Sequence, residues 1–123
     1  MAVRTQNKEI LGKMVSVTQW PATKAIEMQV KLLASIKGYT IDLIELEDDA
    51  EIIKMLQIAM STAGEGFIPM VREFVSAAAV DGKAVSAAML DMEYSGNLTR
   101  MFLTFAFVAK VNYQDFFGIG QGA

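Results

Sequence analysis

The segment 97–113 most constrains the fold, because it is apolar on nearly every side when it is drawn as a helix. One side of that helix carries Leu98, Met101, Phe102, Phe105, Val108 and Val111, and the other carries Leu103, Ala106 and Phe107. A helix of this kind lies either at the centre of its domain or against another chain. Its longest apolar run, Met101–Ala109, is far shorter than the ~20 residues of a membrane span, so no membrane contact is predicted.

The residue types that are missing exclude most kinds of active site. The chain of 123 residues is of single-domain size, and it contains neither cysteine nor histidine. Disulfides, thiolate nucleophiles, cysteine-ligated metals and histidine-dependent triads are therefore excluded. We expect no catalytic residue, no cofactor and no metal site, and we predict that the protein is not an enzyme.

The net charge of −3 is unevenly distributed along the chain. Residues 1–41 hold six basic and two acidic side chains, whereas residues 42–51 hold six acidic and no basic ones. No strongly basic face is evident, so nucleic-acid binding is not predicted. The first ten residues are polar, which is not typical of a signal peptide, and we expect a cytosolic protein.

The apolar spacing predicts a mainly α-helical single domain with four principal helices. Their expected ranges are 21–37, 49–62, 67–79 and 97–113. Extended structure is expected only within 14–20 and 79–94, where Asp81-Gly82 favours a small hairpin. Residues 39–47 fit a short helix or a strand equally well, and 86–94 give no clear pattern.

The domain boundaries and the expected core residues follow from the same reading of the sequence. We expect a flexible N-terminus over 1–13, a helical domain over 14–117 and a flexible glycine-rich tail over 118–123. Nine residues are predicted to form the core: Ile26, Val30, Leu33, Ile53, Leu56, Val71, Phe74, Phe102 and Phe105.

Two short motifs are better explained by a role in the fold than by the binding of a metal ion or a phosphate. The acidic run Asp42–Glu51 lacks the glycine of a calcium loop and has apolar residues among its acids, so a helix cap with a solvated face is favoured. Gly64 and Gly66 precede a helix, as in phosphate loops, but the lysine and hydroxyl of such a loop are missing. A helix–helix turn is the better interpretation.

A partner-binding site is predicted near the C-terminus. Methionine is abundant, with nine residues, and methionine-rich surfaces recur in adaptable binding proteins. Exposed aromatic side chains often mark interaction sites. The candidate residues are Phe107, Tyr113, Phe116 and Phe117. The acidic run is the competing site, through attraction to a basic partner.

Four segments, in order along the chain, resemble a family of bacteriophage tail assembly chaperones. Val17–Ala25 resembles the opening "V-T-Q-x-P-A-T-K-A", and Phe107–Gly118 resembles the ending "F-V-x-x-V-N-F-x-D-F-F-G". Val80–Lys83 and Tyr94–Asn97 resemble the middle turn and the segment before the last helix. Tyr113 stands where the family usually has phenylalanine.

The resemblance implies a small helical protein that binds the tape measure protein, the long helical chain that sets tail length. Such proteins keep their client soluble until the tail tube polymerises, and they are absent from the mature virion. In many phages a ribosomal frameshift gives a longer form that is thought to recruit the tail tube protein. The expected location is the cytoplasm of the host bacterium, and the oligomeric state stays open, a homo-oligomer included.

Two other functions fit the residues as well. A structural tail component retained in the virion would use the same helices for permanent interfaces. A helical adaptor without catalysis or a phage role is the other alternative.

Overall fold

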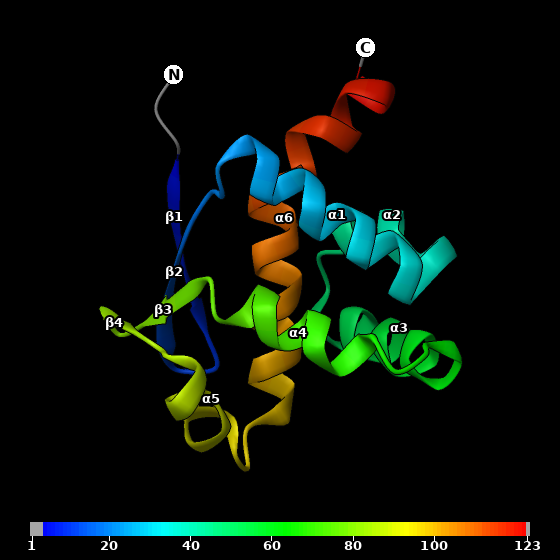
Figure 1. Ribbon diagram of the computed structural model, residues 1–123. Helices are drawn as coiled ribbons and strands as arrows, with labels where there is room; N and C mark the ends of the chain where they lie inside the picture. Colours follow the sequence, from blue (N-terminus) through cyan, green and yellow to red (C-terminus); the bar gives the residue numbers. More distant parts are fainter. Residues whose placement is uncertain (1–3, 123) are drawn as a thin grey trace.

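The central element is the long helix α6 (Leu98–Gly122), which the other elements surround (Figure 1). The computed structural model describes residues 4–122, and the side chains of residue 37 and of 116–122 lie outside this description. Residues 103–109 of α6 are all buried, so the apolar pattern around this helix reflects a central position. The mainly α-helical fold is confirmed.

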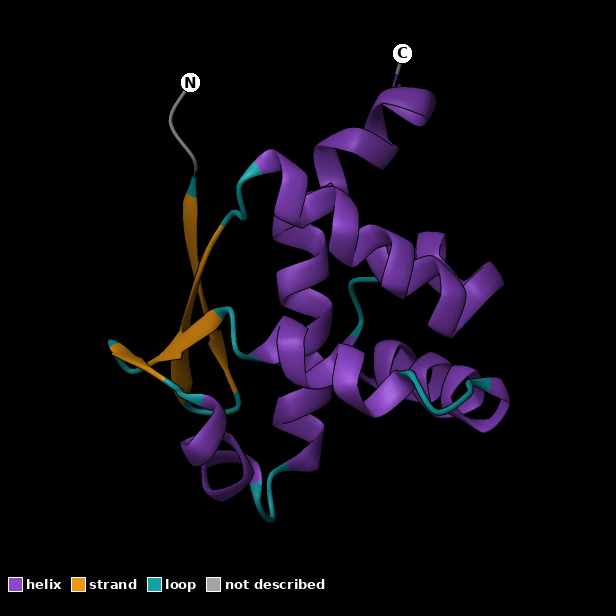
Figure 2. Cartoon of the chain, viewed as in Figure 1, coloured by secondary structure: helices purple, strands orange, loops and turns teal. Residues whose placement is uncertain are grey.

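Helices cover one side of α6, and a small sheet lies on the other (Figure 2). The remaining helices are α1 (Ala22–Ile36), the 3-10 turn η1 (Lys37–Tyr39), α2 (Thr40–Glu45), α3 (Asp49–Thr62), α4 (Phe67–Val75) and α5 (Ala87–Tyr94). Of these, α2, α3 and α4 pack most extensively on α6. The helix predicted over 49–62 is confirmed, and the ambiguous segments 39–47 and 86–94 contain α2 and α5.

The sheet is antiparallel, in the order β1 (Thr5–Ile10), β2 (Lys13–Thr18), β3 (Ala78–Val80), β4 (Lys83–Ala84). Two-residue turns, Leu11-Gly12 and Asp81-Gly82, close its hairpins. Each turn residue has a positive φ, between 49° and 86°, as the turns that match strand twist require. The hairpin at Asp81-Gly82 is confirmed. Its aspartate accepts a hydrogen bond from the Met14 backbone N–H at 2.9 Å, which joins the two hairpins.

Two predicted boundaries near the sheet are wrong. Extended structure is not confined to 14–20 and 79–94, since β1 lies within the segment 1–13 and pairs along its whole length with β2. The helix expected over 67–79 ends at Val75, because residues 78–80 pair with β2 as strand β3. Both errors have one cause: β1 and β3 are both stabilised by pairing with β2, and the local periodicity of a segment does not report such pairing.

The last helix is longer than predicted. It continues past residue 113 to Gly122, nine residues beyond the expected end. The predicted flexible tail of 118–123 overlaps this helix as far as Gly122, and residue 123 lies outside the described residues. The flexibility of this segment stays a prediction.

The core is only partly the predicted one. Leu56, Val71, Phe74 and Phe105 are fully buried, as predicted, whereas Ile53 and Phe102 are half-buried. The remaining three predicted core residues, all on α1, are exposed: Ile26, Val30 and Leu33. Helix α1 has two apolar stripes, and it is the second stripe, Met28, Leu32 and Ile36, that packs inward.

Phe74 is the aromatic centre of the core. Its ring meets that of Phe105 edge-on at 5.0 Å between centroids and that of Trp20 at 5.1 Å. The Tyr113 ring lies 6.4 Å away. Edge-to-face pairs of this kind stabilise a core beyond the area that they bury. These contacts tie α4, α6 and the start of α1 together.

Three hydrogen bonds, here called the clamp, join α6 to the segment 19–25. They run from Gln19 Nε2 to the Val111 carbonyl at 3.1 Å, from the Trp20 N–H to Asn112 Oδ1 at 2.8 Å, and from the Tyr113 hydroxyl to the Ala25 carbonyl at 2.7 Å. Three successive residues of α6 therefore fix where α1 begins.

Candidate partner-binding surface

Two of the four C-terminal aromatic residues, Phe107 and Tyr113, are not exposed as the sequence predicts. Phe107 is 7% exposed and Tyr113 is 3% exposed, so both belong to the core. Tyr113 is held there by the clamp, and burial raises the pKa of its hydroxyl. The side chains of Phe116 and Phe117 lie outside the described residues. Nothing in the described part therefore supports an exposed aromatic site at this end.

Three large apolar side chains reach solvent at helical spacing on α1. Ile26 is 58% exposed, Val30 63% and Leu33 45%. They follow one another at i, i+4 and i+7, so they form one continuous line along the helix. Together with the exposed Ala22 they are called the α1 stripe. No described element of this chain covers it.

Contacts made by the sides of α1 that face away from the stripe hold the stripe toward solvent. Lys24 and Lys31 reach across to Glu73 of α4, with N–O distances of 3.4 and 2.7 Å. The hydrogen bond from Lys31 is the main cause of the lowered pKa of the Glu73 carboxyl. Exposed ion pairs stabilise a fold little, but these two, with the clamp, fix the rotation of α1. The helix therefore cannot turn its stripe inward without breaking them.

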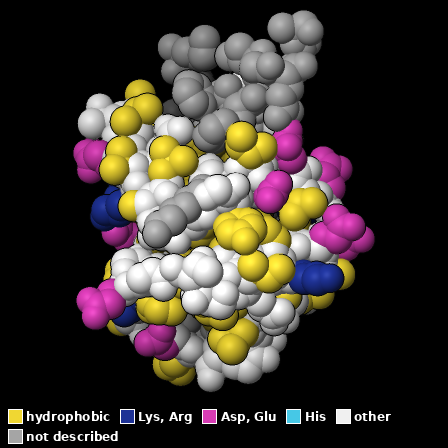
Figure 3. Space-filling view, turned by 90° about the vertical axis from the view of Figure 1, so that its right-hand side faces the viewer, with side chains coloured by type: hydrophobic (Ala, Val, Ile, Leu, Met, Phe, Trp, Pro, Cys, Tyr) yellow, Lys and Arg dark blue, Asp and Glu magenta, His cyan; other side chains and the backbone are white. Residues whose placement is uncertain are grey.

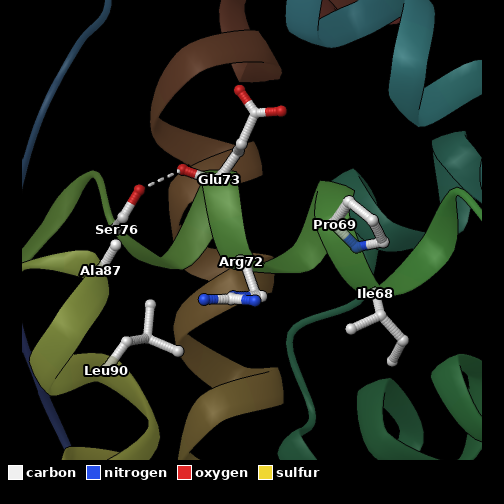
Figure 4. Close-up of a pocket in the computed structure, with 7 residues that line it drawn as sticks. All are labelled: Ile68, Pro69, Arg72, Glu73, Ser76, Ala87 and Leu90. Atoms are coloured by element: carbon white, nitrogen blue, oxygen red, sulfur yellow. Dashed lines mark hydrogen bonds between the residues drawn. The ribbon is translucent and has the colours of Figure 1, made fainter.

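Two hollows flank α4, one on each side. The hollow toward α5 has a volume of about 320 Å³ and is lined by Ile68, Pro69, Arg72, Glu73, Ser76, Ala87 and Leu90 (Figure 4). The hollow toward α1 has a volume of about 280 Å³ and is lined by Lys31, Ala34, Ser35, Gly66, Pro69, Met70 and Glu73. Both share Pro69 and Glu73, so α4 forms the ridge between them. They can each accept a side chain of a partner.

The described geometry therefore offers apolar surface to a partner. The model of the phage tail assembly chaperone protein (TAC) family matches residues 11–122. The chain belongs to this family. The match includes all four segments that carry the resemblance, so the predicted family is confirmed. No curated protein and no solved structure matched the chain.

In this tail assembly chaperone the acidic run forms a solvated surface. The six acidic side chains from Asp42 to Glu51 are all exposed. Acidic side chains lie among apolar ones on the face shown in Figure 3, which is the side of the molecule that bears α2 and α3. Asp48 caps α3 by accepting hydrogen bonds from the backbone of Ala50 and Glu51 at 2.8 and 3.3 Å. The predicted helix cap is confirmed.

The pKa shifts of Lys110 and Tyr94 in the chaperone are explained by the burial of these side chains. Lys110 of α6 donates to the backbone carbonyls of Ile44, at 2.8 Å, and of Leu46, and so binds the end of α2. Its partial burial lowers the pKa of the ammonium group. Burial likewise raises the pKa of Tyr94, over whose ring the Arg100 guanidinium lies at 4.6 Å.

The described part of the chaperone contains neither a cluster of metal-binding side chains nor a membrane-spanning helix. Within residues 4–122, no group of three or more acidic side chains is placed to hold a metal ion. No helix among the described residues has the length and apolar character needed to cross a membrane.

Sequence reasoning missed the α1 stripe because it assigned the stripe to the core. A signal was nevertheless present. Met28, Leu32 and Ile36 form a second line with the same spacing, and the polar residues Lys24 and Lys31 lie on the side of the helix next to it. Two apolar lines on one helix of a small domain leave one of them for solvent or for a partner.

Proposed function

We propose that this tail assembly chaperone binds the tape measure protein and keeps it soluble until the tail tube polymerises. The family match supports a role in tail assembly. The α1 stripe supports the finer proposal, because it is apolar surface that no described element of the chain covers. A long helical client would aggregate through its own apolar faces, and a helix that covers them competes with that process.

The chemistry that the chain lacks also favours binding over catalysis. The two hollows beside α4 contain no cysteine, no histidine and no paired carboxylates. A holdase needs only an apolar surface and a rigid support for it. The clamp and the two ion pairs from α1 to Glu73 supply that support.

Coexpression with the tape measure protein of the same phage tests the proposal. With the wild-type chaperone the client should appear in the soluble fraction. With Ile26→Ser combined with Val30→Ser, most of it should pellet. The matched control is Ile58→Ser combined with Met60→Ser, which removes two exposed apolar side chains from α3 instead. If the client is equally soluble with the stripe variant, or insoluble with the wild type, the proposal fails.

We also propose that the chaperone acts in the host cytoplasm and leaves before the virion is complete. A structural tail component is the rival function. Mass spectrometry of purified virions separates the two, since a stoichiometric amount of this chain in the particle would favour the rival.

A longer form with a C-terminal extension, which would recruit the tail tube protein, completes the proposal. The C-terminal end of α6 lies beyond α1, away from the sheet (Figure 1). An extension that starts there could grow outward without displacing a described element. The nucleotide sequence around the last codons tests this part, because a slippery heptamer before the stop codon is required.

A further inference from the structure

The hollows on either side of α4 carry an inference about the client, and it rests on the proposed function. We propose that they are a docking site for an amphipathic helix of the tape measure protein that places one apolar anchor in each hollow and an acidic residue on Arg72. The α1 stripe is a separate surface, on the side of α1 away from α4.

The charges around α4 favour an acidic partner. Glu73 is the one acid among the residues that line the two hollows, and it is already paired with Lys24 and Lys31. Arg72 lines the hollow toward α5, and it has no ion pair within the described residues. In Figure 4 its guanidinium lies in front of α4, while Glu73 points away from it toward α1. The free cation therefore faces the space where a partner would lie.

The apolar walls of the hollows favour an apolar side chain of the partner next to the partner's acidic residue. In the hollow toward α5, Ile68 and Pro69 lie on one side of Arg72 and Ala87 and Leu90 on the other (Figure 4). Ile68 is 59% exposed and so can still be covered. The hollow toward α1 has Ala34, Pro69 and Met70 in its wall. A partner that fills both hollows buries apolar surface on both sides of the α4 ridge.

The width of α4 fixes the spacing of the two anchors. A helix with its side chains is about 10 Å across, so hollows on its two sides are about 10 Å apart. In a helix that crosses α4, residues i and i+7 lie on one face and about 10 Å apart, at ~1.5 Å per residue. The residue midway between them passes over Pro69 and must be small. The recognised pattern is therefore two large apolar residues seven apart, with a small residue between them and an acid beside one anchor.

Synthetic peptides test this pattern directly. The first probe is a labelled alanine-based helix of about 20 residues with two leucines seven apart, alanine midway and glutamate beside one leucine. The second has lysine in place of that glutamate, and the third has its leucines five apart, on different faces. By fluorescence anisotropy, the full-length chaperone should bind the first probe at least about tenfold more tightly than either of the others. This preference should hold although the chaperone itself carries a net charge of −3.

Variants of the chaperone assign the binding to the hollows. Arg72→Glu should reverse the preference between glutamate and lysine probes, and Ile68→Ser should weaken the first probe at least about fivefold. Lys54→Glu is the matched control: it makes the same change of charge at an exposed position of α3 and should leave binding unchanged. Circular dichroism melts check that each variant is folded.

Three results would overturn the inference. They are equal affinity for the glutamate and lysine probes, unchanged binding by Arg72→Glu and Ile68→Ser, and self-association of the chaperone that Arg72→Glu abolishes, since a second copy would then be the occupant. The coexpression assay separates this inference from the proposed function. A chaperone that solubilises the tape measure protein through the α1 stripe but ignores the first probe contradicts only the docking site.

Discussion

Helices α1 and α6 are both rich in apolar residues, yet the structure uses them in opposite ways. Helix α6 is apolar almost all round and is buried through 103–109, so it is covered by its own chain. Helix α1 has a polar side and yet exposes Ile26, Val30 and Leu33. The most apolar helix, α6, is therefore not the one that exposes a line of apolar side chains to solvent. The surface that we propose for a partner lies on the helix that has more apolar faces than its place at the edge of the domain can bury.

The largest expected effect concerns α6. Phe105→Ala removes a fully buried ring that packs edge-on against Phe74. The free energy of unfolding should fall by about 3–5 kcal/mol, from lost burial and the cavity left behind. Urea denaturation followed by circular dichroism measures this change. Phe102→Ala should cost clearly less, because Phe102 is only half-buried. Equal losses at the two positions would show that α6 is not packed as described.

A smaller effect is expected where the two helices meet. Tyr113→Phe removes the hydroxyl that donates to the Ala25 carbonyl, and at pH 8 it should lower the free energy of unfolding by about 1 kcal/mol. Burial raises the pKa of Tyr113 above its unfolded value of about 10. The neutral hydroxyl is therefore favoured in the fold, and its contribution is complete below pH ~10 and is lost as the pH rises further.

Urea titrations of both proteins at pH 8 and at about pH 11 check this prediction. The wild type should lose more stability than Tyr113→Phe between the two pH values, so the gap between them should close. Burial raises the pKa of Tyr94 as well, but that residue is present in both proteins and its effect cancels. A gap that widens at high pH would contradict the assignment.

The smallest effect on stability is expected at the α1 stripe. Ile26→Ser combined with Val30→Ser changes two exposed side chains and should alter the free energy of unfolding by no more than about 0.5 kcal/mol per site. The same variant is the one expected to lose the client. Thermal melts measured beside the coexpression assay would sharpen the contrast with α6. A large loss of stability would place the stripe in an interface within the fold.

The parts of the fold that follow from local signals were predictable from the sequence. Asp48 before an apolar run marked the start of α3, and Asp81-Gly82 marked a hairpin. The strand β1 was not predictable in this way, because its residues are mostly exposed and gain their structure from pairing with β2. Local pattern also cannot say which of two apolar lines on α1 is buried. That choice depends on tertiary contacts: the packing of Met28, Leu32 and Ile36 in the core, and ion pairs such as that of Lys31 with Glu73, 42 residues away in the chain.

The candidate site was less predictable than the fold. Tyr113 and Phe107 were predicted to contact a partner because the last helix has more apolar faces than a small domain can cover, and exposed aromatic clusters often mark interaction sites. The structure buries both, and the acceptor of the Tyr113 hydroxyl, Ala25, lies 88 residues away in sequence. The hollows beside α4 combine residues of α1, α4 and α5. Only the tertiary arrangement brings these together.

The clamp also determines how tension would pass through the molecule. A pull on the C-terminal end of α6 reaches Val111, Asn112 and Tyr113 before it reaches the Phe105 layer. There the load is shared among three hydrogen bonds and transferred to the segment 19–25. The segment that leads into α1 would therefore carry part of the load. Because the rings of Trp20 and Tyr113 also contact Phe74, a load applied at that end of the chain passes to the aromatic core as well as to the start of α1.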